Sequence, residues 1–201
     1  FQNKEIDVLV GTQMLTKGLD FEGVGLVGVL NADQLLNIPD FRAHERCFQL
    51  LTQVAGRAGR KGEQGQVLIQ TYQPDHEIME QVGGLNYAGF FKAQMAERKH
   101  FYYPPEVKII QLTLKHRNIQ TLNQAAAVLE APLRSKFGKA LLGPEFPPLS
   151  RVRGQYQKRF QLKLSKASSS SVKAALKHIV NGFEMQGQFR SVRVSIDVDP
   201  Y

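Results

Sequence analysis

The residues best suited to chemistry lie in one segment, Gln53-Val-Ala-Gly-Arg-Ala-Gly-Arg60. On a helix with about 100° between successive residues, Gln53, Arg57 and Arg60 fall within roughly 60° of one another. Arginine stays charged and offers a planar fork of donors that matches phosphate oxygens. The spacing therefore favours binding of a phosphate-rich ligand. A solvated basic helix end is the alternative, because arginines also interact favourably with the C-terminal dipole of a helix.

The element that must position these arginines is a helix over residues 40–60. Pro39 breaks the preceding segment, and Asp40 is a suitable N-cap. One apolar face is predicted from residues that recur at three- to four-residue spacing: Cys47, Phe48, Leu51, Val54, Ala55 and Ala58. Gly56 and Gly59 lower helix stability, so their presence favours a role in which the backbone approaches a ligand closely.

The rest of the first half predicts strands of a parallel sheet. The apolar run 6–10 predicts a buried strand, and it leads into the glycine- and hydroxyl-bearing segment 11–21. Backbone amides often meet phosphate at such strand-to-turn junctions. Further strands are expected at 24–30 and 66–72, and the first of these ends in Asn31-Ala-Asp33, where ligands gather in open α/β sheets. Strand–helix alternation thus predicts an α/β lobe.

The second half predicts a small, separate α+β domain. Strand patterns are present at 107–115, 150–153, 156–164 and 192–198. Helices are expected over about 118–137 and after the serine run 168–171, with an irregular connection over 141–148. The order β-α-β-β-α-β is typical of a split βαβ arrangement, in which two helices cover one face of an antiparallel sheet.

These patterns divide the chain into three parts. A partial sheet lobe is expected over residues 1–74, a helical linker over 75–105 and the α+β domain over 106–201. Tyr103-Pro-Pro105 ends the helical pattern, because proline bars helix continuation and restricts the residue before it.

Charge is unevenly distributed along the 201 residues, whose formal net charge is +8. Residues 1–100 carry 10 Lys and Arg against 12 Asp and Glu, whereas residues 101–201 carry 16 against 6. The second half is therefore a candidate polyanion binder, and nucleic acid is the commonest partner for such an excess. A basic domain that is merely soluble is the alternative.

Cys47 is the only cysteine, which excludes a disulfide and a cysteine-based zinc site within the chain. Its place on the apolar face predicts a buried side chain rather than a nucleophile. No apolar run reaches transmembrane length and no signal sequence opens the chain, so a cytoplasmic protein without membrane contacts is expected. The chain opens with Phe1 in a polar run, so we expect it to be a piece of a longer protein.

Six cations surround a predicted hairpin: Arg151, Arg153, Lys158, Arg159, Lys163 and Lys166. Tyr156 and Phe160 are interleaved with them. Lysine and arginine can neutralise DNA phosphates, while aromatic rings can stack on unpaired bases. Strand alternation favours the alternative that both rings face the core. The six charges alone would still support DNA binding that is independent of sequence.

Two motifs in the first half together resemble the fifth and sixth motifs of superfamily-two helicases: Gly11-Thr-Gln-Met-Leu-Thr-Lys-Gly-Leu-Asp-Phe21 and the segment Gln53–Arg60. The intervening residues 39–46 and 49–52 are similar to the PriA family, the primosomal replication-restart helicases. Four segments of the second half resemble the C-terminal domain of that family: Tyr103-Pro-Pro105, Leu142-Gly-Pro144, Arg153-Gly-Gln-Tyr156 and Asp197-Val-Asp-Pro200. The resemblance covers essentially the whole chain and implies part of the second RecA-like lobe followed by the C-terminal domain.

By this resemblance, the protein is an ATP-dependent DNA helicase that moves 3′ to 5′ and acts in replication restart and primosome assembly. The resemblance implies that Arg60 is the arginine finger of the ATP site, that Arg57 lies beside it and that Gln53 orients the pair. It also implies two smaller sets of contacts: Gly18 and Asp20 on the ATP side, and Thr12 and Gln13 on the DNA backbone.

The chain departs from a complete helicase in two respects. It has no G-x-x-x-x-G-K-[ST] phosphate loop and no recognisable acidic motif for magnesium. We therefore expect ATP and Mg²⁺ to be bound mainly by another lobe, the family's zinc to lie elsewhere in the parent protein, and this chain alone to lack ATPase and unwinding activity.

The resemblance also implies partners and a place of action. The partners are single-stranded and forked DNA, the single-stranded DNA-binding protein and other primosome proteins, in the bacterial cytoplasm at the nucleoid. Two other functions stay open at this point: a RecG-like fork-remodelling helicase, and a non-enzymatic scaffold that binds DNA or protein.

Overall fold

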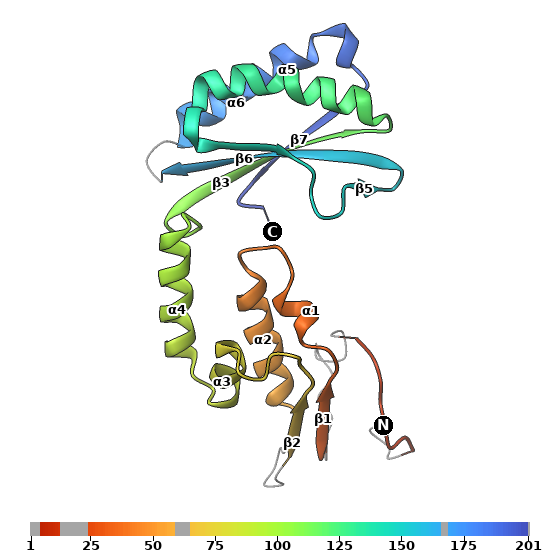
Figure 1. The fold of residues 1–201 in the computed structure, drawn as a ribbon, viewed down its shortest axis with the longest axis vertical. Coiled ribbons are helices and arrows are strands. Elements are labelled where there is room, and N and C mark those ends of the chain that lie inside the picture. The colour runs from red at the N-terminus through yellow and green to blue at the C-terminus, as the bar shows by residue number, and fades with distance from the viewer. Residues whose placement is uncertain (1–4, 13–23, 59–64, 166–168, 201) are drawn as a thin grey trace. The chain divides into compact units, whose positions relative to one another are not determined.

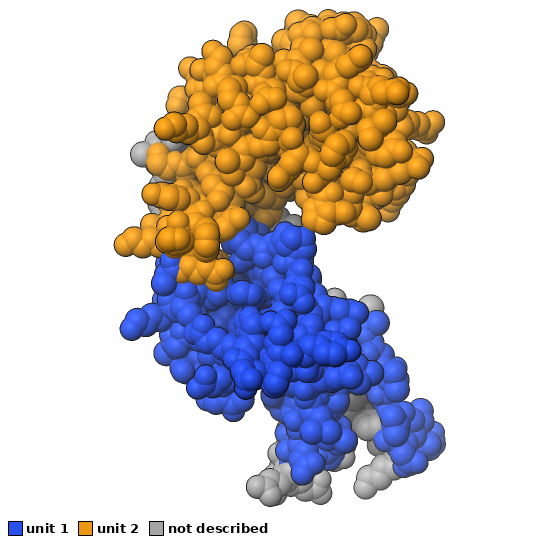
Figure 2. All heavy atoms as spheres, viewed as in Figure 1, with its two compact units in different colours: residues 1–96 blue, residues 97–201 orange. Residues whose placement is uncertain are grey.

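The computed structural model describes residues 5–12, 24–58, 65–165 and 169–200 (Figure 1). The chain divides into two compact units, residues 1–96 and 97–201 (Figure 2). Their boundary lies within the predicted linker 75–105. The strands form a small parallel sheet in the first unit and a separate antiparallel sheet in the second, and helices accompany both sheets. This arrangement confirms the predicted fold class.

The described residues of the first unit form two parallel strands and four helices. Its elements are β1 (Leu26–Val29), α1 (Asp33–Leu36), α2 (Ala43–Ala55), β2 (Gln66–Ile69), α3 (Glu77–Gly83) and α4 (Tyr87–His100), the last of which continues into the second unit. β1 pairs with β2 in parallel, Leu26 opposite Gln66. The core residues come from the helices: Leu36, Cys47, Phe48, Leu51, Ile78, Val82 and Phe90.

The predicted linker contributes to this core. Ile78, Val82 and Phe90 are all nearly inaccessible, and the rings of Phe48 and Phe90 stack with their centroids 4.3 Å apart. Residues 77–90 thus pack as part of the first unit, because their apolar side chains complete the buried face that α2 presents.

The run 6–10 does not form the predicted buried strand. Residues 5–12 have no strand partner among the described residues, and Val8 and Val10 are 74% and 84% exposed. A β-strand is stable only when a neighbouring strand takes up its N–H and C=O groups. In the described part of the first unit β1 and β2 pair only with each other, and residues 6–10 do not extend that sheet.

The second unit consists of an antiparallel sheet and two long helices. In chain order its elements are β3 (Val107–His116), α5 (Ile119–Phe137), the short 3₁₀ turn Gly138–Ala140, β4 (Leu141–Glu145), β5 (Arg151–Val152), β6 (Gln155–Ser165), α6 (Ser169–Glu184), a second 3₁₀ turn Gly187–Phe189 and β7 (Arg193–Val198). The sheet order is β4-β6-β3-β7, and β5 forms a hairpin with β6. Figure 1 shows α5 and α6 on one side of this sheet.

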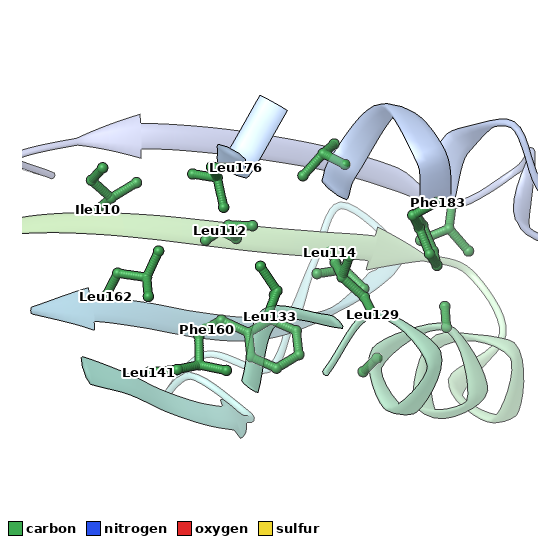
Figure 3. Close-up of a cluster of buried hydrophobic side chains, with 14 of the residues drawn as sticks. Ile110, Leu112, Leu114, Leu129, Leu133, Leu141, Phe160, Leu162, Leu176 and Phe183 are labelled. Carbon is green, nitrogen blue, oxygen red and sulfur yellow. The ribbon is translucent and has the colours of Figure 1, made fainter. Parts of the chain in front are cut away.

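Strand alternation explains the core of the second unit. On β3, Ile110, Leu112 and Leu114 face the helices, and on β6 Phe160 and Leu162 do the same (Figure 3). The helices contribute their own apolar stripes: Leu122, Ala126, Leu129 and Leu133 from α5, and Leu176, Val180 and Phe183 from α6. Asn118 caps α5, because its Oδ1 accepts a hydrogen bond of 2.9 Å from the Thr121 N–H.

The predicted irregular connection over 141–148 is wrong in its first part, because β4 occupies Leu141–Glu145. Leu141 pairs with Leu162 and Glu145 with Arg159, and the register shifts between them. Gly143 has a φ of +89°, and a Cβ there would lie 2.5 Å from the Arg159 carbonyl oxygen. The Gly-Pro pair that suggested a loop therefore forms a bulge within an edge strand.

The lengths and compositions of the helices also bear on membrane insertion. Over the described residues, none of the helices combines the length and the apolar character that crossing a bilayer would require.

Candidate functional site

The predicted phosphate-binding segment lies at the end of α2. The helix ends at Ala55, and the Arg57 N–H donates to the Val54 carbonyl at 3.0 Å, an i→i−3 bond that tightens the last turn. Gln53 is exposed and Arg57 is partly exposed. The helix therefore ends earlier than the predicted 40–60 because Gly56 favours termination, and the assumed angle between Gln53 and Arg57 does not apply.

The start of α2 also differs from the prediction. The helix begins at Ala43 rather than at Asp40. Asp40 nevertheless organises this end: its Oδ1 accepts a 2.8 Å hydrogen bond from the Arg42 N–H, and its Oδ2 forms a 3.3 Å ion pair with Arg46.

Several predicted site residues lie outside the described part of the chain: Arg60, Gln13, Gly18, Asp20 and Lys166. Thr12, the remaining predicted site residue within the fifth motif, is described and exposed.

The carboxyl ends of β1 and β2 are joined by Asp33. Its carboxylate accepts hydrogen bonds of 3.0 Å from the Tyr72 N–H and 3.0 Å from the Thr71 hydroxyl, and one of 3.4 Å from Gln73 Nε2. The hydrogen bond from Tyr72 is the largest cause that lowers the pKa of Asp33, while burial partly opposes it. With its oxygens occupied, Asp33 stabilises the end of the sheet rather than presenting a ligand there.

Arg57 and Asp33 do not converge on one site. α2 runs in the direction opposite to β1 and β2 (Figure 1), so Arg57 follows the helix towards the amino ends of the strands. Asp33 lies at their carboxyl ends. The first unit therefore separates the segment that carries the arginines from the internal network around Asp33.

The β5–β6 hairpin presents three of the predicted DNA-binding cations. Arg153 and Gly154 form its turn with φ of +48° and +76°, and Arg153 is exposed. The Arg151 guanidinium lies 5.0 Å from the centroid of the Tyr156 ring, and Lys158 Nζ lies 4.8 Å from that of Phe146. These cation–π contacts hold two positive charges beside aromatic rings at one end of the sheet.

The predicted cations do not form a single patch. Successive side chains on a strand point to opposite faces, so Lys158 shares the face of Phe160, whereas Arg159 and Lys163 lie on the face without helices. Phe160 is completely buried in the core, which agrees with the alternative that strand alternation favoured. Base stacking by Phe160 is therefore excluded in this fold.

Lys163 makes contacts within the second unit. Its Nζ donates a 2.8 Å hydrogen bond to the Phe101 carbonyl and lies 3.8 Å from the centroid of the Tyr103 ring. Burial lowers the pKa of this lysine. The sequence predicted a DNA contact at Lys163, but these contacts fix the segment after α4 to the sheet.

On the face of the sheet without helices, here called the open face, Arg159 is the strongest candidate for a contact with a DNA phosphate. Its Nε is buried and has no hydrogen-bond partner among the described residues. The register places Thr113 opposite Arg159 and places Lys115 opposite Gln157, so Lys115 lies on the same face. Sequence reasoning missed Lys115 because it lies on another strand; the alternation of residues 107–115 was the only signal for its face.

Comparison with known proteins decides the family. Over its whole length, the chain is 38% identical to the replication restart protein PriA of Bacillus subtilis (strain 168). Residues 99–201 match the family described as the primosomal protein N C-terminal domain. The chain belongs to the PriA family. Residues 1–62 also match the helicase conserved C-terminal domain.

Other PriA proteins are similar over the same extent. The chain is 44% identical to the replication restart protein PriA of Synechocystis sp. (strain ATCC 27184 / PCC 6803 / Kazusa) and 36% identical to that of Treponema pallidum (strain Nichols), in both cases over its full length. It spans only about a quarter of the length of these PriA relatives: 25%, 24% and 30%.

Proposed function

We propose that this chain is part of an ATP-dependent 3′–5′ DNA helicase that acts in replication restart and primosome assembly. The observation that carries the proposal is similarity to PriA proteins along the entire chain, together with the match of residues 1–62 to a helicase domain. Membership of the PriA family favours this function over RecG-like fork remodelling.

In this proposal the first unit supplies arginines to ATP. Arg60 acts as the arginine finger and Arg57 lies beside it, where positive charge stabilises the transferring phosphoryl group. Gln53, exposed one turn before Arg57, orients the pair. Gly18 and Asp20 belong to the ATP side, and Thr12 and Gln13 to the DNA side.

The remaining ATP contacts are assigned to other parts of the longer protein. The chain has no phosphate loop and one cysteine, and no group of three His, Cys, Asp or Glu in its described portion could hold a metal ion. We therefore propose that Mg²⁺ and most of the ATP are bound by another lobe, and that zinc is also held outside this chain.

The second unit is proposed to bind single-stranded or forked DNA through phosphates. Arg151, Arg153 and Lys158 present charge around the hairpin, while Arg159 and Lys115 do so on the open face. Lys166 extends this set along the chain. We propose that the partners of the intact protein at the fork include the single-stranded DNA-binding protein and other primosome proteins. The place of action is the bacterial cytoplasm, at the nucleoid.

The ATPase proposal is tested by Arg60→Ala in the intact protein. We expect DNA-stimulated ATP hydrolysis to fall at least about a hundredfold, because an arginine finger contributes a factor of about 10³–10⁵ in related phosphoryl transfer. Lys139→Ala, an exposed change in the second unit, is the control. Unchanged turnover in Arg60→Ala would favour the scaffold function. Phosphate release by the purified 201-residue chain would contradict its expected inactivity.

The DNA-binding proposal is tested by the salt dependence of binding. The slope of log K against log [salt] is negative, and its magnitude falls by about 0.7–0.9 for every DNA phosphate that the protein no longer neutralises. We expect the triple variant Arg151→Ala/Arg153→Ala/Lys158→Ala to bind single-stranded DNA more weakly and with a slope smaller by about two. An unchanged slope would show that the hairpin does not bind phosphates.

A further inference from the structure

One end of the sheet in the second unit gathers positive charge from three separate parts of the chain. β3 ends there, β7 begins there and the β5–β6 hairpin turns there, as the strand registers show. The segments that meet are 111–121, 146–160 and 185–196. They carry two, four and two Lys or Arg residues respectively, and no Asp or Glu. The region formed by these cations is called the basic end below.

Two of these cations face each other across neighbouring strands. Lys115 of β3 pairs with Arg193 of β7, and both lie on the open face of the sheet. Like charges directly opposite one another in a sheet are destabilising, whereas opposite charges are favourable. Within the described residues, neither cation takes part in an ion pair. The fold therefore keeps an unfavourable pair, which an anion bound between the two side chains would make favourable.

Arg159 lies next to this pair on the same face. It is two residues beyond Gln157, which pairs with Lys115, and such diagonal neighbours lie about 7–8 Å apart. The Arg159 Nε is buried without a hydrogen-bond partner among the described residues. Glu145 lies opposite Arg159 in β4, yet no ion pair joins them in the described structure. Three strands thus each place a cation here without an internal counter-ion, an arrangement that suits the phosphates of a polyanion.

Two further arginines flank the Lys115–Arg193 pair. His116 Nε2 lies 3.1 Å from the Ser191 Oγ, a hydrogen bond that joins the end of β3 to the turn before β7. Arg117 follows His116 and Arg190 precedes Ser191, and both arginines are exposed. The basic end therefore extends across the sheet, from the hairpin to the start of β7.

The aromatic rings at the basic end are buried or already carry a cation. Phe189 is 5% exposed. Arg151 lies over the ring of Tyr156, and Lys158 lies over that of the exposed Phe146. Proteins that bind single strands usually combine cations with free rings that stack on bases, whereas the bases of a duplex are already stacked and its phosphates dominate affinity. The side chains of the basic end therefore favour double-stranded over single-stranded DNA.

The width of the basic end also suits a duplex. β5, β6, β3 and β7 lie side by side in that order, and three steps of about 4.8 Å give about 14 Å from the hairpin to β7. The grooves of DNA are about 6–12 Å wide, so cations on both sides of the basic end can reach phosphates of both strands.

We propose that the basic end binds a double-stranded arm of a DNA fork through its phosphates, with Lys115, Arg193 and Arg159 at the centre of the contact. This inference rests on the proposed DNA binding by the second unit and specifies the form of DNA that this unit takes. The duplex supplies the negative charge that the Lys115–Arg193 pair lacks within the described residues.

Binding of two probes by the 201-residue chain tests the proposal. The probes are a blunt DNA duplex and a single strand of the same length, followed by fluorescence anisotropy. In Lys115→Gln/Arg193→Gln we expect the Kd for the duplex to rise at least about tenfold, with a salt slope smaller in magnitude by about two. The Kd for the single strand should change less than about threefold, because a flexible strand can shift to neighbouring cations and a stiff duplex cannot.

The matched control is Lys136→Gln/Lys139→Gln, which removes the same charge from exposed residues before β4 and should leave both Kd values within about twofold. An equal loss of affinity for both probes in Lys115→Gln/Arg193→Gln would overturn the choice of double-stranded DNA and leave the DNA-binding proposal intact. If the unaltered chain binds neither probe, the proposed DNA binding and this inference are both wrong.

A charge reversal separates ligand binding from a structural role. Arg193→Glu places an acid opposite Lys115, so the urea midpoint of unfolding should stay the same or rise, while affinity for the duplex should fall at least about tenfold. A less stable chain that binds the duplex with unchanged affinity would show that Arg193 serves the fold alone and would overturn the proposal.

Discussion

Lys163 is joined to Phe101 by a 2.8 Å hydrogen bond from its Nζ to the Phe101 carbonyl oxygen. This bond, with the Tyr103 ring 3.8 Å away, ties the segment that follows α4 to the middle strand β6. A cation that the sequence predicted as a DNA contact therefore stabilises the fold. A structural role of Lys163 can be told from a DNA-binding role, because removal of its ammonium group would lower stability in the first case and DNA affinity in the second.

Replacing Lys163 by methionine should lower the free energy of unfolding by about 1 kcal/mol, the usual net value of one hydrogen bond. Methionine keeps much of the apolar stem and removes only the ammonium. Urea unfolding measures this change, with Lys139→Met as the exposed control. Affinity for single-stranded DNA should change less than in Lys158→Met. A Lys163→Met variant of unchanged stability that binds DNA poorly would support the DNA contact predicted for Lys163 and contradict its structural role.

The same lysine should titrate below the ordinary lysine pKa of 10.5, because burial disfavours its charged form. Since the folded pKa is lowered, the folded state binds fewer protons than the unfolded state. Its contribution to stability therefore improves as the pH rises from the folded pKa towards 10.5. The Nζ or Cε resonance of Lys163, followed by NMR between about pH 8 and pH 11 where the fold persists, gives the value. A pKa above 10.5 would contradict burial as the dominant cause.

Asp33→Asn should make the first unit less stable at neutral pH and less sensitive to acid. The hydrogen bond from Tyr72 lowers the Asp33 pKa, so its stabilising contribution is present above the ordinary carboxyl pKa of 3.8. That contribution is lost as the pH falls through the lowered pKa. Urea unfolding from about pH 2 to pH 7 measures both effects. Asp75→Asn is the exposed control, and an identical acid profile in both variants would contradict the role of Asp33.

Cys47 should resist alkylation in the folded chain. Burial, and secondarily the charge of Asp33, raise the pKa of this thiol to about 11, so little thiolate is present at pH 8. Iodoacetamide should modify it only after unfolding in urea, as mass spectrometry would show. Labelling of the native chain at the rate of a free cysteine would mean that the first unit opens readily around α2.

Gly143→Ala should destabilise the second unit by about 2–3 kcal/mol, because it combines a positive φ with a clash. The new Cβ would lie 2.5 Å from the Arg159 carbonyl, a backbone atom that cannot rotate away. Gly187→Ala, which meets nothing within 4 Å, is the matched control and should change stability by less than about 1 kcal/mol. Equal unfolding midpoints for the two variants would show that the bulge tolerates a side chain.

Local sequence patterns were enough to predict the types of most elements and the buried face of each long one. The alternation at 107–115 and 156–164 predicted β3 and β6, and the apolar spacing at 118–137 predicted α5, because local periodicity reports which side chains avoid water. The same reasoning correctly placed Phe160 in the core. The paired motifs and the segments of the second half also sufficed to indicate the PriA family.

Which side chains are engaged in internal contacts, and which strand edges are unpaired among the described residues, became known only from the three-dimensional fold. Lys163 is engaged by Phe101, sixty-two residues earlier in the chain, and Asp33 by Tyr72, thirty-nine residues later. Residues 6–10 have a strand-like pattern but no partner among the described residues, and the sheet of the second unit ends at β7 among the described strands. Such facts depend on contacts between residues distant in sequence, and local spacing carries no information about those contacts.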